Sequence, residues 1–411
     1  MNLYIAIILF ILIGKFILNL VIEISNVKHA SLLLPEEFVG VYDAQRYSQS
    51  QSYLKETTYF KLFREIIFTL LTVFFIISGG VNFTDQIARS FNCGPILTGL
   101  IFAGILLLIF QVINIPFSAY YTFVIEDKYG FNRSTISTFI LDILKGLLLS
   151  IVIGGMVLAG ILWFFTRGGK WGWVYCWAAV VLFQILLIFI APVVLLPIFN
   201  KFTPLEEGEV KHAIENYLKK QNFKMKGIFK MDASRRSTKS NAFFTGLGRF
   251  KRIVLFDTLI KRHTPEEIVS ILAHEVGHYK KRHVIKSMIL FTATVGIMFF
   301  LLSVFINNFH FAAFKMEEPS VYVSLFFFSF FYQPLHLFFT ILSNYFSRKY
   351  EYEADAFAVL TYKKPLAFIS ALKKIARDNL SNLTPSPLKV FFSYSHPPIL
   401  KRIEAIRKIP V

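Results

Sequence analysis

Two histidines four residues apart are the side chains best suited to metal chemistry in this chain of 411 residues. If the segment is helical, His274 and His278 lie on one face, and two imidazoles in that arrangement can bind one zinc ion. Glu275 lies beside them, placed to accept a proton from a water molecule. The spacing therefore predicts a zinc site and, as its chemistry, hydrolysis by activated water.

The start of a helix around these residues is predicted by the segment that precedes them. Thr264 has the character of an N-cap, Pro265 that of a first helical residue, and Glu267 that of the reciprocal partner in a capping box. Apolar residues continue with helical spacing from Ile268. We therefore expect both histidines on a well-capped helix.

A third ligand is expected from a separate helix, because catalytic zinc takes three protein ligands and keeps one position open. Glu351 and Asp355 are four residues apart and share a helix face, whereas Glu353 points away from them. We assign Glu351 to zinc and Asp355 to an outer position, where it would hold a histidine N–H. The spacing alone leaves open an exposed acidic patch.

The elements that must position these residues belong to a chain of membrane character. Hydrophobic residues make up 55% of the chain and charged residues 17%, and soluble domains carry about 25% charged residues. A spanning helix needs about 20 mostly apolar residues. Seven stretches qualify, covering roughly residues 3–23, 62–82, 95–116, 139–165, 172–199, 284–306 and 321–343. We predict an all-α polytopic membrane protein, with the first stretch kept as a helix because no signal-peptide cleavage site follows it.

Positive charge lies in two blocks outside these stretches. Residues 201–286 hold 19 basic and 9 acidic residues, and residues 347–411 hold 12 and 5, in a chain of net charge +18. Seven spans with the N-terminus outside place both blocks in the cytoplasm, as the positive-inside rule demands. We therefore predict an N-out, C-in protein of a bacterial inner membrane or the endoplasmic reticulum, with membrane lipids as partners and no nucleic acid.

The spans and blocks suggest four segments. Residues 1–200 would hold the first five membrane helices, and residues 201–286 a cytoplasmic, mostly helical segment with the metal-ligand helix and a small β element. Residues 287–346 would hold the last two membrane helices, and residues 347–411 the third zinc ligand.

Two pairs of side chains within the spans allow structural interpretations. Asp142 and Lys145 are three residues apart and are expected to pair near the membrane edge, the alternative being a polar internal cavity. Cys93 and Cys176 are expected to be unpaired, buried thiols, with a disulfide as the open alternative.

Five segments in this order resemble the type I CAAX prenyl protease family, which consists of integral membrane zinc metallopeptidases. They are residues 123–132, 240–246, 274–278, 347–355 and 394–398. The resemblance implies seven tilted helices around a chamber, with a zinc metalloprotease domain at the cytoplasmic end. It also implies one zinc ion, with His274, His278 and Glu351 as ligands and Glu275 as the catalytic base.

The same resemblance implies further site residues. The segment at Asn241, Ala242 and Phe243 resembles an edge strand that holds the substrate backbone, with the Asn241 side chain touching the peptide. His396 resembles a histidine that faces the reaction centre and stabilises an oxyanion. A turn-capping role for Asn241 and a packing role for His396 remain open. Polar positions that brace the site are matched by Asn344, Arg348 and Arg402, although Arg348 could instead anchor a helix end at the lipid surface.

The implied activity is removal of three residues after a prenylated cysteine, so the partner is a peptide or protein substrate. A quality-control protease acting on unprenylated membrane proteins is the alternative. A transporter would explain the spans but not a capped metal-ligand helix. A silent scaffold would be expected to have lost a ligand or the base, and both are present.

Overall fold

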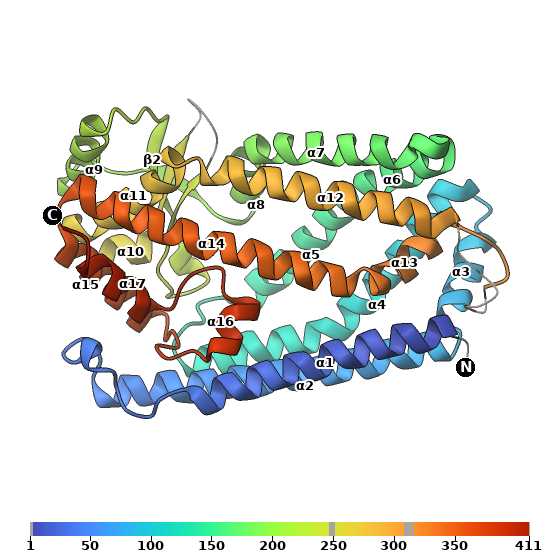
Figure 1. Cartoon of the computed structure of the whole chain (residues 1–411), viewed down its shortest axis with the longest axis horizontal. Helices are drawn as coiled ribbons and strands as arrows, with labels where there is room; N and C mark the ends of the chain where they lie inside the picture. The colour runs from blue at the N-terminus through green and yellow to red at the C-terminus, as the bar shows by residue number, and fades with distance from the viewer. Residues whose placement is uncertain (1–2, 246–250, 308–313, 315, 411) are drawn as a thin grey trace.

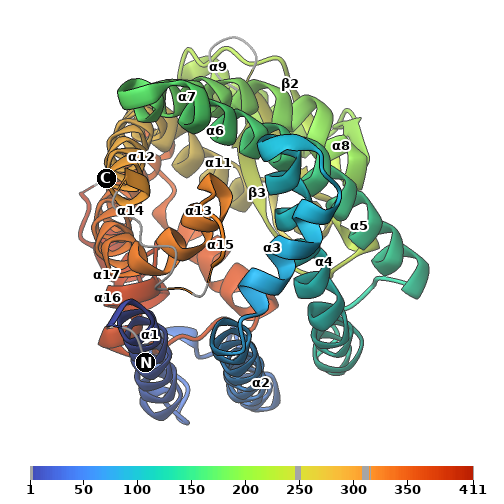
Figure 2. The same cartoon turned by 90° about the vertical axis from the view of Figure 1, so that its right-hand side faces the viewer.

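The computed structural model describes residues 3–245, 251–307, 314 and 316–410. Long helices run along the longest axis of the molecule, and a small sheet with shorter helices lies at one end (Figure 1). Viewed along that axis, the long helices form a ring (Figure 2). The described residues thus divide into a helical ring and a mixed end that contains both histidines.

The long-helix part follows the apolar stretches. In chain order its helices are α1 (Leu3–His29), α2 (Ala44–Ile77), α3 (Gly80–Ser90), α4 (Gly94–Tyr120), α5 (Ile136–Leu149), α6 (Gly155–Arg167), α7 (Gly172–Ile190), α8 (Leu196–Phe199), α12 (His283–Asn307), α13 (Val321–Phe331) and α14 (Gln333–Tyr362). Within the described residues, five helical segments are long and apolar enough to cross a membrane, and the number rises to seven if each of two bent pairs counts as one span. All seven predicted stretches overlap these candidates.

Two of the predicted stretches, 62–82 and 321–343, are bent. Helices α2 and α3 meet at 70°, and α13 and α14 at 57°. The first break follows Gly79, whose φ of 81° places it in the left-handed region that ends helices. The second lies just before Pro334, in the first turn of α14, where the missing N–H of proline interrupts the helical hydrogen bonding that would continue α13.

A four-stranded sheet forms the centre of the mixed end. Its strands are β1 (Phe202–Pro204), β2 (Gly227–Met231), β3 (Ala242–Thr245) and β4 (Arg252–Phe256), in the order β1-β2-β4-β3. Strand β4 pairs parallel with β2 and antiparallel with β3, so β3 lies at an edge. Gly246, the last residue of the segment 240–246, lies outside the described residues.

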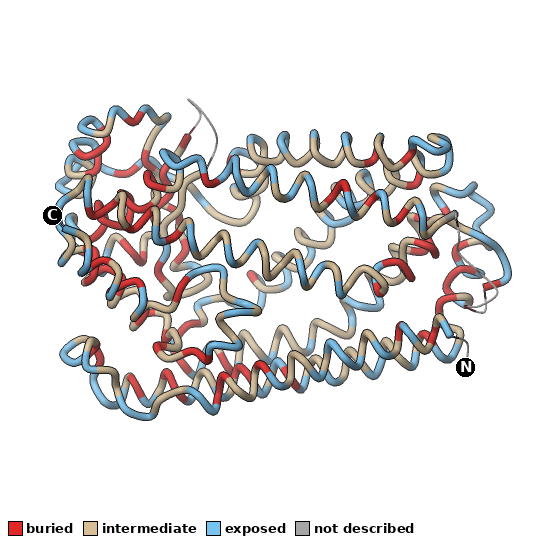
Figure 3. The backbone as a smooth tube through the Cα atoms, in the orientation of Figure 1, coloured by how far each residue is buried: buried red, intermediate tan, exposed pale blue. Residues whose placement is uncertain are grey.

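Shorter helices complete the mixed end, some against the sheet and some against other helices. They are α9 (Glu209–Lys220), α10 (Asp257–Arg262), α11 (Pro265–Lys280), α15 (Pro365–Asp378), α16 (Pro387–Ser393) and α17 (Ile399–Arg407). Buried residues concentrate here, whereas the long helices are mostly intermediate or exposed (Figure 3). Helix α11 runs through this core, with Ile268, Val269, Ala273 and Val276 fully buried. The core thus holds the histidine helix rigidly at the end of the ring.

Two expectations about polar groups in the spans were wrong in part. Asp142 does not pair with Lys145: Arg236 Nε and Nη2 donate to its two oxygens over 2.7 and 2.9 Å, and Lys145 donates to the Ile198 carbonyl. A bidentate guanidinium offers the carboxylate two aligned donors, which an ammonium on the same helix cannot. The two cysteines are unpaired as expected, but only Cys176 is buried and Cys93 is exposed.

Candidate active site

The helix that carries the two histidines begins as the sequence predicts. Thr264 Oγ1 accepts a hydrogen bond from the Glu267 amide over 3.3 Å, and Glu267 Oε2 accepts one from the Thr264 amide over 2.9 Å. This is the expected capping box. The Glu267 carboxylate also binds Ser370 and Lys374, over 2.6 and 2.8 Å, so the start of α11 is tied to α15.

A glycine lets α14 approach the histidine helix closely. A Cβ on Gly277 would lie 3.0 Å from the Cα and the carbonyl oxygen of Ala354. Any larger side chain would therefore separate the two helices. Because Glu351 lies one turn before Ala354 on α14, this close packing places its carboxylate within reach of the histidines.

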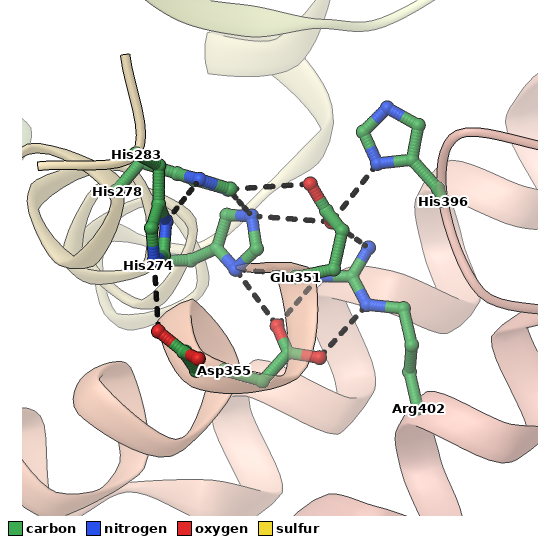
Figure 4. Close-up of polar contacts among 8 residues, drawn as sticks. His274, His278, His283, Glu351, Asp355, His396 and Arg402 are labelled. Carbon is green, nitrogen blue, oxygen red and sulfur yellow. Dashed lines mark hydrogen bonds and ion pairs between the residues drawn. The ribbon is translucent and has the colours of Figure 1, made fainter. Parts of the chain in front are cut away.

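Three metal-binding side chains converge at this contact (Figure 4). His274 Nε2 and His278 Nε2 are 3.1 Å apart. Glu351 Oε1 lies 3.2 Å from His278 Nε2, and Glu351 Oε2 lies 3.5 Å from His274 Nε2. Ligand atoms of all three residues lie within 4.8 Å of one another. The arrangement brings together the three residues that the sequence analysis assigned to zinc.

The donor set suits a metal such as zinc. Two imidazole nitrogens and one carboxylate are the ligands of many catalytic zinc sites. Glu351 is 3% exposed and His274 7%, so a cation here would be shielded from bulk water on the protein side. The Nδ1 atoms of both histidines contact other side chains, which leaves their Nε2 atoms for a metal.

The first histidine is held from behind by a buried ion pair. His274 Nδ1 lies 2.7 Å from Asp355 Oδ1. Arg402, on α17, donates to Asp355 through Nε over 2.9 Å and through Nη2 over 2.6 Å. Asp355 and Arg402 are thus brought to the positions expected for residues that orient a ligand.

The carboxylates of Asp355 and Glu351 raise the pKa values of the basic side chains beside them. Burial by itself would lower the pKa of Arg402, but the charges of Asp355 and Glu351 raise it above its ordinary value. The Glu351 carboxylate, 2.9 Å from His396 Nδ1, likewise raises the pKa of that imidazole. A higher pKa increases the share of the protonated imidazole, which donates hydrogen bonds from both ring nitrogens.

The two other bracing candidates contact the segment that carries His396 rather than the histidine helix. Asn344 Nδ2 donates to the Phe392 carbonyl over 3.2 Å. Arg348 Nη1 donates to the carbonyls of Val390 and Tyr394, over 3.1 and 2.7 Å. These contacts join α14 to α16 and to the chain just before His396.

The strand segment lies where an extended peptide could add to the sheet. Ala242 and Phe243 belong to β3 and, among the strands of the described residues, pair only with β4. Asn241 precedes the strand and is exposed. Its side-chain oxygen accepts a hydrogen bond from the Ala242 amide over 2.8 Å, the local bonding that the turn interpretation expects.

Glu275 faces a cavity of about 730 Å³ between the mixed end and the ring. It is half-buried on α11. The cavity is lined by residues from β3, α7, α11, α12 and α14, including Phe244, Gln184, His278, Phe291 and Tyr350. A substrate bound here would meet both the potential base and a metal held by His278.

Sequence reasoning missed one residue in contact with the site. His283, at the start of α12, is 3% exposed, and its Nδ1 lies 3.0 Å from His278 Nδ1. Its Nε2 lies 3.0 Å from Glu353 Oε2. Glu353 therefore faces away from the metal cluster, toward His283. The signal available in the sequence was a third histidine five residues after His278.

Comparisons with known proteins agree with this geometry along the whole chain. Residues 23–201 match the CAAX prenyl protease N-terminal family, with five membrane helices, and residues 204–410 match peptidase family M48. The chain is 34% identical over 383 residues to the CAAX prenyl protease 1 homolog of Arabidopsis thaliana, covering 91% of this chain and 90% of that one. It is 37% identical over 416 residues to the probable CAAX prenyl protease 1 of Schizosaccharomyces pombe, covering 96% and 86%.

The fold is similar to that in the crystal structure of S. mikatae Ste24p, with a TM-score of 0.91, 30% identity and 99% of each chain covered. Site and fold together define a membrane-embedded metalloendopeptidase. The chain belongs to peptidase family M48, among the type I CAAX prenyl proteases. The resemblance, the helical membrane fold with a small sheet and the enzyme class are thereby confirmed, and a metal cofactor is implied by the family.

Proposed function

We propose that this chain is a zinc metalloendopeptidase that removes the C-terminal tripeptide of prenylated CAAX proteins. The observation that carries the proposal is the convergence of His274, His278 and Glu351 beside Glu275, at one wall of a large cavity. The names of the relatives, CAAX prenyl protease 1 in several organisms, support the substrate class.

In this mechanism each residue has a defined task. When bound by His274, His278 and Glu351, zinc would polarise the scissile carbonyl and lower the pKa of water. Glu275 accepts a proton from the attacking water and then delivers it to the leaving amine. His396 donates a hydrogen bond to the oxyanion that develops on the carbonyl oxygen.

The remaining residues orient the ligands and the substrate. Asp355, held by Arg402, fixes the His274 ring with Nε2 toward the metal. Asn344 and Arg348 hold the backbone before His396 through the carbonyls that they bind.

The edge strand supplies the peptide contacts. Ala242 and Phe243, directly after Asn241, present the edge of β3 that no other described strand pairs with, and an extended peptide forms main-chain hydrogen bonds there without its sequence being read. Asn241 contacts the same peptide.

The cavity supports a substrate with a lipid attached. Its volume of about 730 Å³ lies in the range of about 300–1,000 Å³ typical of ligand pockets. Aromatic side chains line it: Phe244 from the sheet, Phe291 and Tyr350 from α12 and α14, and Phe223 from the segment between α9 and β2. A prenyl chain could therefore lie against the membrane helices while the peptide reaches Glu275.

The proposal also includes the orientation of the chain in the membrane and its division into a protease part and a membrane part. Both basic blocks belong to the mixed end or adjoin it, so the positive-inside rule supports a cytoplasmic active site with the N-terminus outside. Residues 201–286 and 347–411 would form the protease part, and residues 1–200 and 287–346 the membrane part. Membrane lipids and a prenylated protein substrate are the partners.

The test joins metal analysis to cleavage of a farnesylated CAAX peptide by the purified full-length chain. We expect one zinc per chain, and cleavage by the wild type but not by Glu275→Gln, which should retain zinc. Zinc with cleavage of unmodified membrane-protein segments only would replace the CAAX assignment by the quality-control alternative. Absence of zinc from folded protein would overturn the metallopeptidase mechanism.

A further inference from the structure

The turn after the histidine helix brings a third histidine behind the second. Helix α11 ends at Lys280, and Arg282 has a φ of 57°, in the left-handed region. The chain turns there, and α12 begins at His283. As a result the His283 and His278 rings meet edge to face, with centroids 5.0 Å apart and Nδ1 atoms 3.0 Å apart (Figure 4).

The His283 ring is also held on the sides that face away from His278, by Glu353 and Tyr350. Its Nε2 lies 3.0 Å from Glu353 Oε2. The ring stacks on Tyr350, with centroids 4.4 Å apart and an angle of 11° between the planes. Only 3% of His283 is exposed, so neither ring nitrogen can satisfy its hydrogen bonding with bulk water. The ring is thus held in one orientation by contacts on three sides.

We propose that His283 and Glu353 are positioning residues for His278, the second metal ligand of the proposed function on which this inference rests. If His278 Nε2 binds a metal, the ring proton is on Nδ1, which donates to His283 Nδ1. The remaining proton of a neutral His283 is then on Nε2, which donates to Glu353. The two hydrogen bonds therefore point the same way, from His278 through His283 to the Glu353 carboxylate.

This arrangement parallels the support of the first ligand. Asp355 contacts His274 directly, whereas Glu353 acts on His278 through an intervening imidazole. Both ligands are thereby held by an acceptor on α14, two residues apart in sequence. The different lengths of the two supports follow from geometry, because Glu353 points away from the face that carries Glu351 and Asp355.

The test measures zinc affinity by competition with a chelator, using the full-length protein in detergent. We expect His283→Phe, which keeps an aromatic ring but accepts no hydrogen bond, to weaken zinc binding about 10–100-fold. Glu353→Ala should do the same. Glu353→Gln keeps a carbonyl acceptor and should escape the loss of about 10–100-fold expected for the alanine variant. The visible spectrum of the cobalt-loaded protein should change in the first two variants and not in the third.

The controls separate positioning from stability. Lys281→Ala removes an exposed cation from the same turn and should leave zinc affinity unchanged. Melting temperatures of the metal-free variants show whether each is folded. If His283→Phe does not fold, the comparison of Glu353→Ala with Glu353→Gln tests the positioning role. The Glu353 side chain is 32% exposed, so both variants should fold.

Two failures can be told apart. If the wild type binds one zinc and Glu351→Ala loses it, but His283→Phe and Glu353→Ala both keep wild-type affinity, the positioning role is overturned while the proposed function stands. If the folded wild type binds no zinc, the proposed function itself has failed.

Discussion

Arg402 holds Asp355 by two parallel hydrogen bonds, from Nε to Oδ2 over 2.9 Å and from Nη2 to Oδ1 over 2.6 Å. The pair is almost fully buried, and the same Oδ1 contacts His274 Nδ1. A fork-shaped guanidinium fixes the plane of the carboxylate, so it also fixes the direction from which the imidazole is held. The orientation of the first ligand is thus determined from α17, at the C-terminal end of the chain.

Asp355→Ala should therefore weaken zinc binding and destabilise the fold together. The loss of an outer partner lowers metal affinity about 10–100-fold. Removal of Asp355 also leaves the buried Arg402 with Glu351, 3.4 Å from its Nη1, as its remaining carboxylate, so the loss of stability should stay below the cost of about 3–5 kcal/mol for a fully broken buried pair. Chelator competition and thermal melting measure the two effects. Glu404→Ala, an exposed change on the same helix as Arg402, is the control and should alter neither. Wild-type zinc affinity in Asp355→Ala would refute the role of Asp355 in orienting His274.

Two glutamates on α14 should behave differently towards zinc. Glu351→Ala removes a ligand, so dialysed protein should retain almost no zinc. Glu353→Ala removes only the acceptor behind His283, so it should still reach one zinc per chain when the metal is in excess. Metal analysis before and after dialysis distinguishes them. Full retention of zinc by Glu351→Ala would refute the assignment of Glu351 as the third ligand.

The local part of this site could be predicted from sequence, because its signals are short-range. The capping box at Thr264 and the spacing of His274 and His278 determine a helix face regardless of the fold. Glu351 and Asp355 share a face for the same reason. The partner of Asp142 could not be predicted, because Arg236 lies 94 residues away and reaches it only through the folded sheet.

The contact between His283 and His278 and the position of the helix bends depend on backbone geometry that cannot be predicted from residue types. His283 reaches His278 because Arg282 adopts a left-handed conformation, which is uncommon for a residue with a side chain. The bend before Pro334 follows a recognised rule, but the apolar run around it continues without interruption. Apolar composition therefore predicts where spans lie, and backbone geometry decides where they bend.

Gly277→Ala should disturb the site without changing any polar group. The added Cβ would lie 3.0 Å from the backbone of Ala354, so α11 and α14 must move apart. Overpacking of this kind costs about 1–3 kcal/mol, and zinc affinity should fall because Glu351 moves with α14. Gly146→Ala is the matched control, since nothing lies within 4 Å of its added Cβ. Equal melting temperatures and zinc affinities in the two variants would contradict the close-packing argument.

His396→Ala should slow the chemical step while leaving the metal in place. The side chain is 66% exposed and lies beside Glu351 without being one of the converging ligands. Loss of one oxyanion donor lowers kcat about 100–1,000-fold, with KM and zinc content close to those of the wild type. Steady-state kinetics on the farnesylated peptide measure this. Loss of zinc instead would assign His396 to the metal.

Glu267 should make stability depend on pH in acid. Burial by itself would raise the pKa of this carboxyl, but hydrogen bonds from Lys374, Ser370 and the Thr264 amide bring it below its ordinary value of 4.5. A carboxyl with a lowered pKa in the folded state adds stability above its unfolded pKa, and that contribution is lost as the pH falls through the folded pKa.

Glu267→Gln keeps the capping box but loses the charge that pairs with Lys374, so we expect it to be less stable by about 1–2 kcal/mol at pH 7. The difference from wild type should stay constant down to about pH 5 and shrink below pH 4.5 as the wild-type carboxyl is protonated. Melting in detergent at several pH values measures it. Glu266→Gln, whose carboxylate pairs with Lys364 at the surface, is the neighbouring control and should show little difference at any pH. A Glu267→Gln difference that persists unchanged at pH 3.5 would mean that the amide perturbs packing, and that the charge of Glu267 is not what stabilises the start of the histidine helix.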